Sequence, residues 1–126
     1  MRTLYLDNNA TTPLDPAVNA EMLRVSEVAW ANPSSVHHLG QRARSFLDDA
    51  RDKIASVFRC KPSELIFTSG ATESANLAIF GVARHLRNSG KHIITSAVEH
   101  HAVLLPCKYL AASEGFDLSI LPVDSL

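Results

Sequence analysis

The second half of the chain alternates short apolar runs with longer segments of helical periodicity, and this alternation limits the possible folds more than any other feature. We expect strands at 64–68, 92–96 and 116–120. Between them, one helix follows residue 73 and ends near 88–90, and another runs over 101–113. Strands spaced by helices in this way are parallel and joined by crossover helices, because a hairpin cannot connect parallel neighbours. The sequence therefore predicts an α/β fold.

Two further helices are expected in the first half of the chain. One begins near Pro16, because Asp15 can cap it and proline is favoured at the first helical position. The other spans about 41–59, with an apolar stripe on one side and the opposite charges of Arg44 and Asp48 four residues apart on the other. An N-terminal helical segment is thus expected before the strands.

Composition excludes several classes of partner. The net charge of the 126 residues is −1, which gives no support for nucleic acid or an anionic membrane as a partner. No apolar run has the length of a membrane span, and the first residues do not have the pattern of a signal peptide. Two cysteines are too few for a disulfide scaffold. We expect a cytoplasmic protein.

The segment from Phe67 to Glu73 is a candidate phosphate site. A strand is expected to end there and a helix to begin, so unpaired backbone N–H groups would lie at the positive end of the helix dipole. Gly70 would let an anion approach, and the hydroxyls of Ser69 and Thr72 could add donors. The alternative is an ordinary capped helix whose turn requires Gly70. The glycine spacing differs from that of dinucleotide and nucleoside triphosphate sites.

A second candidate is the segment 96–102, which follows the next expected strand. An imidazole there, from His100 or His101, can lie over a flat heteroaromatic ring or move a proton. The alternative is that His100 and His101 only begin a surface helix. No metal site is expected, because the histidine pairs are adjacent and no metal-ligand spacing occurs. Cys60 and Cys107 are expected to serve packing.

Four segments together resemble one family. They are the opening segment 5–13, the Asn-Pro-Ser-Ser-x-His-x-x-Gly-like segment 32–40, the phosphate-cup-like segment 67–74 and the histidine segment 99–104. In this order and spacing they resemble the cysteine desulfurases of the NifS/IscS group, within the class V aminotransferases. The resemblance implies part of the large domain of a fold-type-I pyridoxal-phosphate enzyme over 41–126, preceded by an N-terminal segment over 1–40.

The resemblance also implies a chemistry. Such enzymes hold pyridoxal 5′-phosphate on a lysine, take sulfur from L-cysteine as a persulfide on a catalytic cysteine, and release L-alanine. Ala71 and Thr72 match the positions that hold the phosphate, and His100 matches the histidine that stacks on the ring and assists proton transfer. Family members are homodimers that pass sulfur to an acceptor or scaffold protein, as in iron–sulfur cluster assembly.

The sequence departs from the family pattern in what it lacks. No residue matches the family's cofactor lysine, the aspartate facing the pyridine nitrogen or the persulfide-forming cysteine, which lie further along in the family. In the family fold, the strand at 64–68 is separated from the other two by strands that come later in sequence. We therefore expect an inactive N-terminal fragment, from a partial gene, reading frame or engineered piece. The alternatives are a related class V lyase or aminotransferase, or a non-catalytic phosphate-binding or interaction domain.

Overall fold

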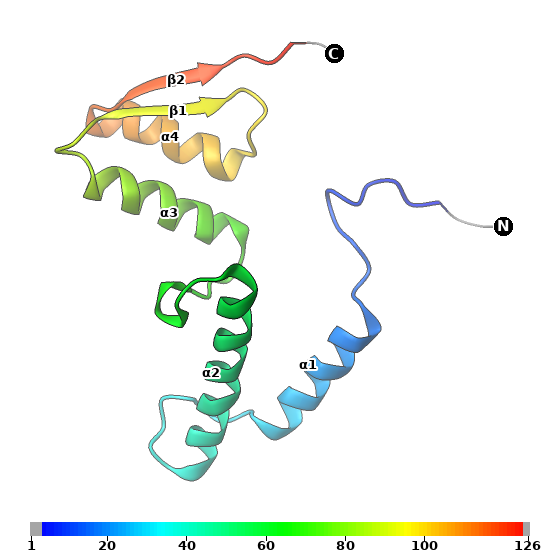
Figure 1. Ribbon diagram of the computed structural model, residues 1–126. Helices are drawn as coiled ribbons and strands as arrows, with labels where there is room; N and C mark the ends of the chain where they lie inside the picture. The colour runs from blue at the N-terminus through cyan, green and yellow to red at the C-terminus, as the bar shows by residue number, and fades with distance from the viewer. Residues whose placement is uncertain (1–3, 125–126) are drawn as a thin grey trace. The chain divides into compact units, whose positions relative to one another are not determined.

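The computed structural model describes residues 4–124, which form two compact units that divide between Leu65 and Ile66 (Figure 1). Residues 1–3 and 125–126 lie outside the described part. The expected domain boundary between residues 40 and 41 concerns the domains of the whole family fold and stays a prediction. In chain order, the elements are α1 (Pro16–Val28), α2 (His38–Phe58), the 3₁₀ helix η1 (Pro62–Glu64), α3 (Ala71–His85), β1 (His92–Ser96), α4 (His101–Glu114) and β2 (Asp117–Leu121).

Helix α1 begins where its capping residues predict. The Asp15 carboxylate accepts a hydrogen bond of 2.7 Å from the amide of Ala17, and Pro16 occupies the first helical position. No residue of α1 is buried, and Val18 and Met22 on its apolar stripe are exposed. The start of the helix is therefore set by local hydrogen bonding and proline rather than by burial.

Helix α2 begins at His38, three residues before the expected start. The reason is a cap, because Nδ1 of His37 accepts a hydrogen bond of 3.4 Å from the amide of Gly40. Ala43 and Ala55 are buried on the inner side of this helix. The helix ends at Phe58, one residue before the expected end, and its C-cap, Arg59, adopts the left-handed conformation (φ 54°).

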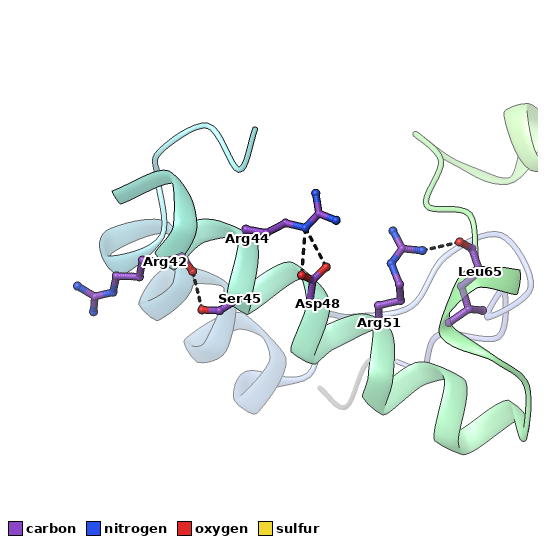
Figure 2. A network of polar contacts seen from close by, with 6 residues as sticks. All are labelled: Arg42, Arg44, Ser45, Asp48, Arg51 and Leu65. Atoms are coloured by element: carbon purple, nitrogen blue, oxygen red, sulfur yellow. Dashed lines mark hydrogen bonds and ion pairs between the residues drawn. The ribbon is translucent and has the colours of Figure 1, made fainter. Parts of the chain in front are cut away.

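The polar side of α2 carries the contacts shown in Figure 2. The guanidinium Nε of Arg44 lies 3.0 Å from both carboxylate oxygens of Asp48, as the four-residue spacing predicts. Further along the helix, Arg51 donates a hydrogen bond to the carbonyl of Leu65. This second contact ties the segment after η1 back to α2.

In the second unit, β1 and β2 are parallel and α4 is the crossover between them (Figure 1). The register pairs His92 with Asp117 and Ser96 with Leu121. Helix α4 lies against the strands and α3 packs on α4. The buried side chains of this unit are those of Thr95, Pro106, Cys107, Leu110 and Phe116. The predicted α/β class and the parallel arrangement are confirmed.

Two pairs of side chains join α3 to α4. The rings of Phe80 and Tyr109 meet edge to face, with centroids 5.7 Å apart. One turn further along α3, Arg84 forms an ion pair of 2.7 Å with Glu114, and its guanidinium lies over the ring of Phe80. These contacts hold the two helices together in one unit.

The prediction of a strand at 64–68 is wrong. Pro62–Glu64 is a 3₁₀ helix, and Leu65 is extended (φ −92°, ψ 132°), but no strand pairs with the segment 65–68 within residues 4–124. An extended segment becomes a strand only when a neighbour completes its backbone hydrogen bonds. The sheet in the described part of the chain contains only β1 and β2. The segment 65–68 therefore follows its local preference for extended backbone but has no neighbouring strand there to pair with.

Candidate functional site

The first turn of α3 has backbone donors that no protein group satisfies. Gly70 is the N-cap and, unlike the caps of α1, α2 and α4, provides no side-chain hydrogen bond. Within residues 4–124, the amides of Ala71 and Thr72 have no acceptor, and the Thr72 hydroxyl makes no hydrogen bond. Two amides and a hydroxyl on a helix N-terminus are suited to an anion.

Gly70 leaves the approach to these donors open. Its φ of 164° is extended backbone that any residue adopts, so the turn does not by itself require a glycine. A Cβ at this position would have no protein atom within 4 Å, so packing does not require one either. The effect of glycine here is to leave space beside the free amides, and this favours the phosphate hypothesis over the simple turn.

The turn before α3 is held by its own side chains. The hydroxyl of Thr68 bonds to that of Ser74 at 2.6 Å, and both hydroxyl oxygens lie 3.2 Å from the carbonyl oxygen of Gly70. The hydroxyl of Ser69, which we expected to face an anion, instead donates to the carboxylate of Glu73 at 2.7 Å. Of the two hydroxyls predicted as donors, only that of Thr72 is therefore available.

His100 stands at the start of α4, and it lines a hollow that residues of α3 also line. It is the N-cap, and its Nδ1 accepts a hydrogen bond of 3.1 Å from the amide of Ala102. Because Nδ1 uses its lone pair in this cap, the ring hydrogen of the neutral imidazole lies on Nε2. The two interpretations of His100 are thus compatible: the residue starts a surface helix, and its Nε2–H is a hydrogen-bond donor on the ring edge away from the cap.

Thr72 and His100 line the same hollow, of about 460 Å³, between the starts of α3 and α4. Ligand sites of small molecules have volumes of this order and combine apolar walls with a few polar groups. The structure therefore brings together Thr72 and the imidazole of His100, which lie in separate segments of the sequence. The residues that line the hollow are Thr72, Asn76, Phe80, His100, His101, Ala102, Leu105, Pro106 and Tyr109.

Asn76 is a polar residue of this hollow that the sequence did not single out. Asn76 lies one helical turn after Thr72, and its side-chain amide donates a hydrogen bond of 2.8 Å to the Thr72 carbonyl. The four-residue spacing puts both side chains on the same face of α3, so it was a usable signal. Asn76 therefore supports the backbone that carries the Thr72 hydroxyl.

The remaining candidates lie elsewhere. Cys107 is buried, and burial raises the pKa of its thiol, which agrees with a packing role. Cys60 follows α2 in the first unit. Among residues 4–124, no group of three or more histidine, cysteine or acidic side chains is placed to hold a metal ion. None of the helices within that range is both long and apolar enough to cross a bilayer.

Another hollow of the second unit is larger, about 650 Å³, but differs in chemistry. Its walls are mostly the apolar side chains of α3, β1 and α4, among them Ile79, Val82 and Val103. Neither Thr72 nor His100 belongs to it. We therefore take the smaller hollow as the candidate site.

Comparison with known proteins identifies the family of the chain. The aminotransferase class-V family profile matches residues 4–126. The chain is 52% identical to the cysteine desulfurase IscS of Dictyoglomus turgidum, over 98% of its own length and 31% of that protein. A solved NifS-like protein matches with a TM-score of 0.84 and 42% identity, over 94% of this chain and 32% of the other. A structure described as SspA in complex with cysteine matches with a TM-score of 0.82 and 39% identity, over 94% and 34%.

These similarities cover nearly all of this chain and only part of its relatives. The chain spans about a third of the length of the proteins it matches. The expected fold, part of the larger fold of NifS-like enzymes, is confirmed, and so is the resemblance on which it was based.

Proposed function

Because the chain belongs to the aminotransferase class-V family, we propose that it supplies the phosphate- and ring-binding part of a pyridoxal-phosphate-dependent cysteine desulfurase. The observation that carries this proposal is the hollow lined by both Thr72 and His100. The donors at Thr72 suit the phosphate of the cofactor, and the flat imidazole of His100 suits its pyridine ring. The similarity to IscS and NifS-like proteins favours desulfurase over other class V activities.

In this proposal, Ala71 and Thr72 hold the cofactor's phosphate. The two free amides and the Thr72 hydroxyl supply three donors, and the helix dipole adds a favourable field. The three donors must converge on one anion, because each dipole contact at an exposed site is worth only about 0.3–1 kcal/mol. Asn76 fixes the Thr72 carbonyl and so keeps the first turn of α3 in shape.

His100 is proposed to contact the cofactor ring and to carry a proton. The cap to Ala102 orients the imidazole with its hydrogen on Nε2. To accept a proton, the ring would release this cap, because Nδ1 holds the lone pair that can take one. Stacking excludes water from one face of the bound ring. When bound, pyridoxal phosphate supplies the electron withdrawal that the chemistry requires, and the protein positions it.

The substrate and partners follow from the family and are part of the proposal. We propose L-cysteine as the sulfur source and L-alanine as the product, consistent with the complex of cysteine with the similar SspA. The sulfur would pass to an acceptor or scaffold protein, for iron–sulfur clusters or another sulfur-containing product. A homodimer and a cytoplasmic location complete the proposed setting.

Calorimetric titration with pyridoxamine 5′-phosphate tests the site on this chain. This ligand has the ring and the phosphate of the cofactor but no aldehyde, so it cannot attach to surface lysines. Pyridoxamine without the phosphate is the matched control. We expect saturable binding of the phosphorylated ligand only. Equal binding of both ligands, or of neither, would refute the proposed phosphate site.

A further inference from the structure

Glu73 makes an unusual contact at the start of α3. Its Oε2 accepts hydrogen bonds of 2.7 Å from both the amide and the hydroxyl of Ser69. In a capping box, a glutamate at the third helical position accepts from the N-cap residue, whose own side chain satisfies a first-turn amide. Here the N-cap is Gly70, and Glu73 reaches past it to the residue before.

This arrangement holds the turn without using the helix's own donors. The carboxylate fixes Ser69 on one side, and the hydroxyls of Thr68 and Ser74 fix the Gly70 carbonyl on the other. An ordinary N-cap side chain would accept from the first-turn amides and occupy them. With Glu73 in this role, the turn is ordered while the amides of Ala71 and Thr72 stay free.

Glu73 carries a negative charge at the same helix end that is proposed to bind an anion. Hydrogen bonds from the hydroxyl and amide of Ser69 hold the pKa of the Glu73 carboxyl below its ordinary value, so the group is ionised at neutral pH. A carboxylate repels a phosphate bound at the same helix end. If charge were its only influence, removing Glu73 would strengthen phosphate binding.

We propose that Glu73 is a positioning residue for the phosphate cup. It shapes the turn 68–71 through Ser69, so that the free amides of Ala71 and Thr72 converge on one anion, and it does not touch the ligand itself. The inference rests on the proposed function, since it assumes that this helix end holds the cofactor's phosphate. By its negative charge alone, Glu73 would weaken phosphate binding; by positioning the turn, it strengthens that binding.

Three substitutions separate positioning from charge. Glu73→Asp keeps the charge, but its side chain is shorter by one carbon–carbon bond of about 1.5 Å and cannot reach Ser69. Glu73→Ala removes charge and contact together. Glu73→Gln removes the charge and keeps an acceptor oxygen. Glu64→Gln is the matched control, because Glu64 likewise accepts a backbone N–H, that of Lys61, at 2.7 Å in the first unit.

The readout is the affinity of the full 126-residue chain for pyridoxamine 5′-phosphate, with amide NMR spectra to show that each variant is folded. Glu73→Ala and Glu73→Asp should weaken binding by about two- to tenfold, the range that one ordinary hydrogen bond produces. Glu73→Gln should stay nearer to the original affinity than Glu73→Ala, and Glu64→Gln should not change it. In the unbound chain, Glu73→Ala and Glu73→Asp should shift the amide resonances of Ser69, Ala71 and Thr72.

The outcomes distinguish the two proposals. If the unsubstituted chain does not bind the phosphorylated ligand, the proposed function fails and this inference fails with it. If it binds, but Glu73→Asp leaves affinity unchanged or Glu73→Ala increases it, the positioning role alone is overturned. Should Glu73→Ala not fold, the comparison of Glu73→Asp with Glu73→Gln decides. A purely electrostatic influence predicts unchanged binding for Glu73→Asp and stronger binding for Glu73→Gln, whereas positioning predicts weaker binding for Glu73→Asp.

Discussion

Thr72, at the second position of α3, and His100, the N-cap of α4, line one hollow although they belong to different helices. What joins them is the packing of α3 on α4 through Phe80 and Tyr109, together with the ion pair of Arg84 and Glu114. The site is therefore as stable as that helix pair.

The two roles of His100 can be separated by substitution. His100→Ala removes both cap and ring, and loss of an N-cap costs about 0.5–2 kcal/mol. His100→Asn removes the ring but provides a good capping oxygen in place of Nδ1. We expect urea denaturation, followed by circular dichroism, to show lower stability for His100→Ala and at least the original stability for His100→Asn. Equal destabilisation by both substitutions would argue against the cap.

Gly40 is expected to tolerate no side chain. A Cβ there would lie 2.6 Å from the Cβ of Ser35 and 2.8 Å from the carbonyl oxygen of Asn32, so backbone must move. Overpacking of this kind costs about 1–3 kcal/mol. The free energy of unfolding of Gly40→Ala should fall accordingly.

The control for this substitution is Gly81→Ala. Gly81 lies inside α3, where an added Cβ would have no neighbouring atom within 4 Å, and alanine in a helix is favoured over glycine by roughly 0.5–1 kcal/mol. This variant should gain stability in the same measurement. A neutral Gly40→Ala would show that the segment 32–40 packs less tightly than the structure indicates.

The ion pair between Arg84 and Glu114 predicts a pH dependence. The hydrogen bond from Arg84 lowers the pKa of Glu114 below its ordinary value of 4.5. A carboxyl whose pKa is lower in the folded state stabilises the fold above its unfolded pKa, and this contribution is lost as pH falls through the folded value. The melting temperatures of the chain and of Glu114→Gln should differ at pH 7. The difference should begin to shrink near the unfolded pKa of about 4.5 and vanish only below the lowered folded pKa. A difference that persists in acid would contradict this account.

The chain is expected to release no alanine from cysteine beyond the rate of free pyridoxal phosphate. The hollow with Thr72 and His100 is lined by neither a lysine nor a cysteine, and Cys107 is buried elsewhere in the unit. The assay compares the chain, the heat-denatured chain and the free cofactor. Turnover by the folded chain well above both controls would mean that a nucleophile outside this hollow takes part.

Local signals predicted most of the structure. Asp15 with Pro16 and the apolar periodicities located the helices and both strands of the sheet. The segment 64–68 could not be predicted in this way, because pairing depends on a neighbour that the local pattern does not contain. The start of α2 was misplaced for another reason, since histidine is not among the usual capping residues.

The candidate site was predictable in its parts but not as a whole. Thr72 and His100 were found from the segments around them, whereas their meeting depends on how α3 packs against α4. The contact of Glu73 with Ser69 was not foreseen either, because the capping-box spacing predicts a bond to the N-cap residue and Gly70 displaces it by one position.

The most direct test of the central claim compares two ligands on two variants of the chain. Thr72→Ala removes one hydrogen bond to a charged phosphate, worth about 1.5–3 kcal/mol, so both inorganic phosphate and pyridoxamine 5′-phosphate should bind roughly ten- to hundredfold more weakly. His100→Asn keeps the cap and removes the ring. It should weaken pyridoxamine 5′-phosphate by about two- to tenfold, as expected for one aromatic stack, and leave inorganic phosphate unchanged. Unchanged binding of both ligands to Thr72→Ala, or loss of inorganic phosphate in His100→Asn, would contradict the assignment of phosphate to Thr72 and ring to His100.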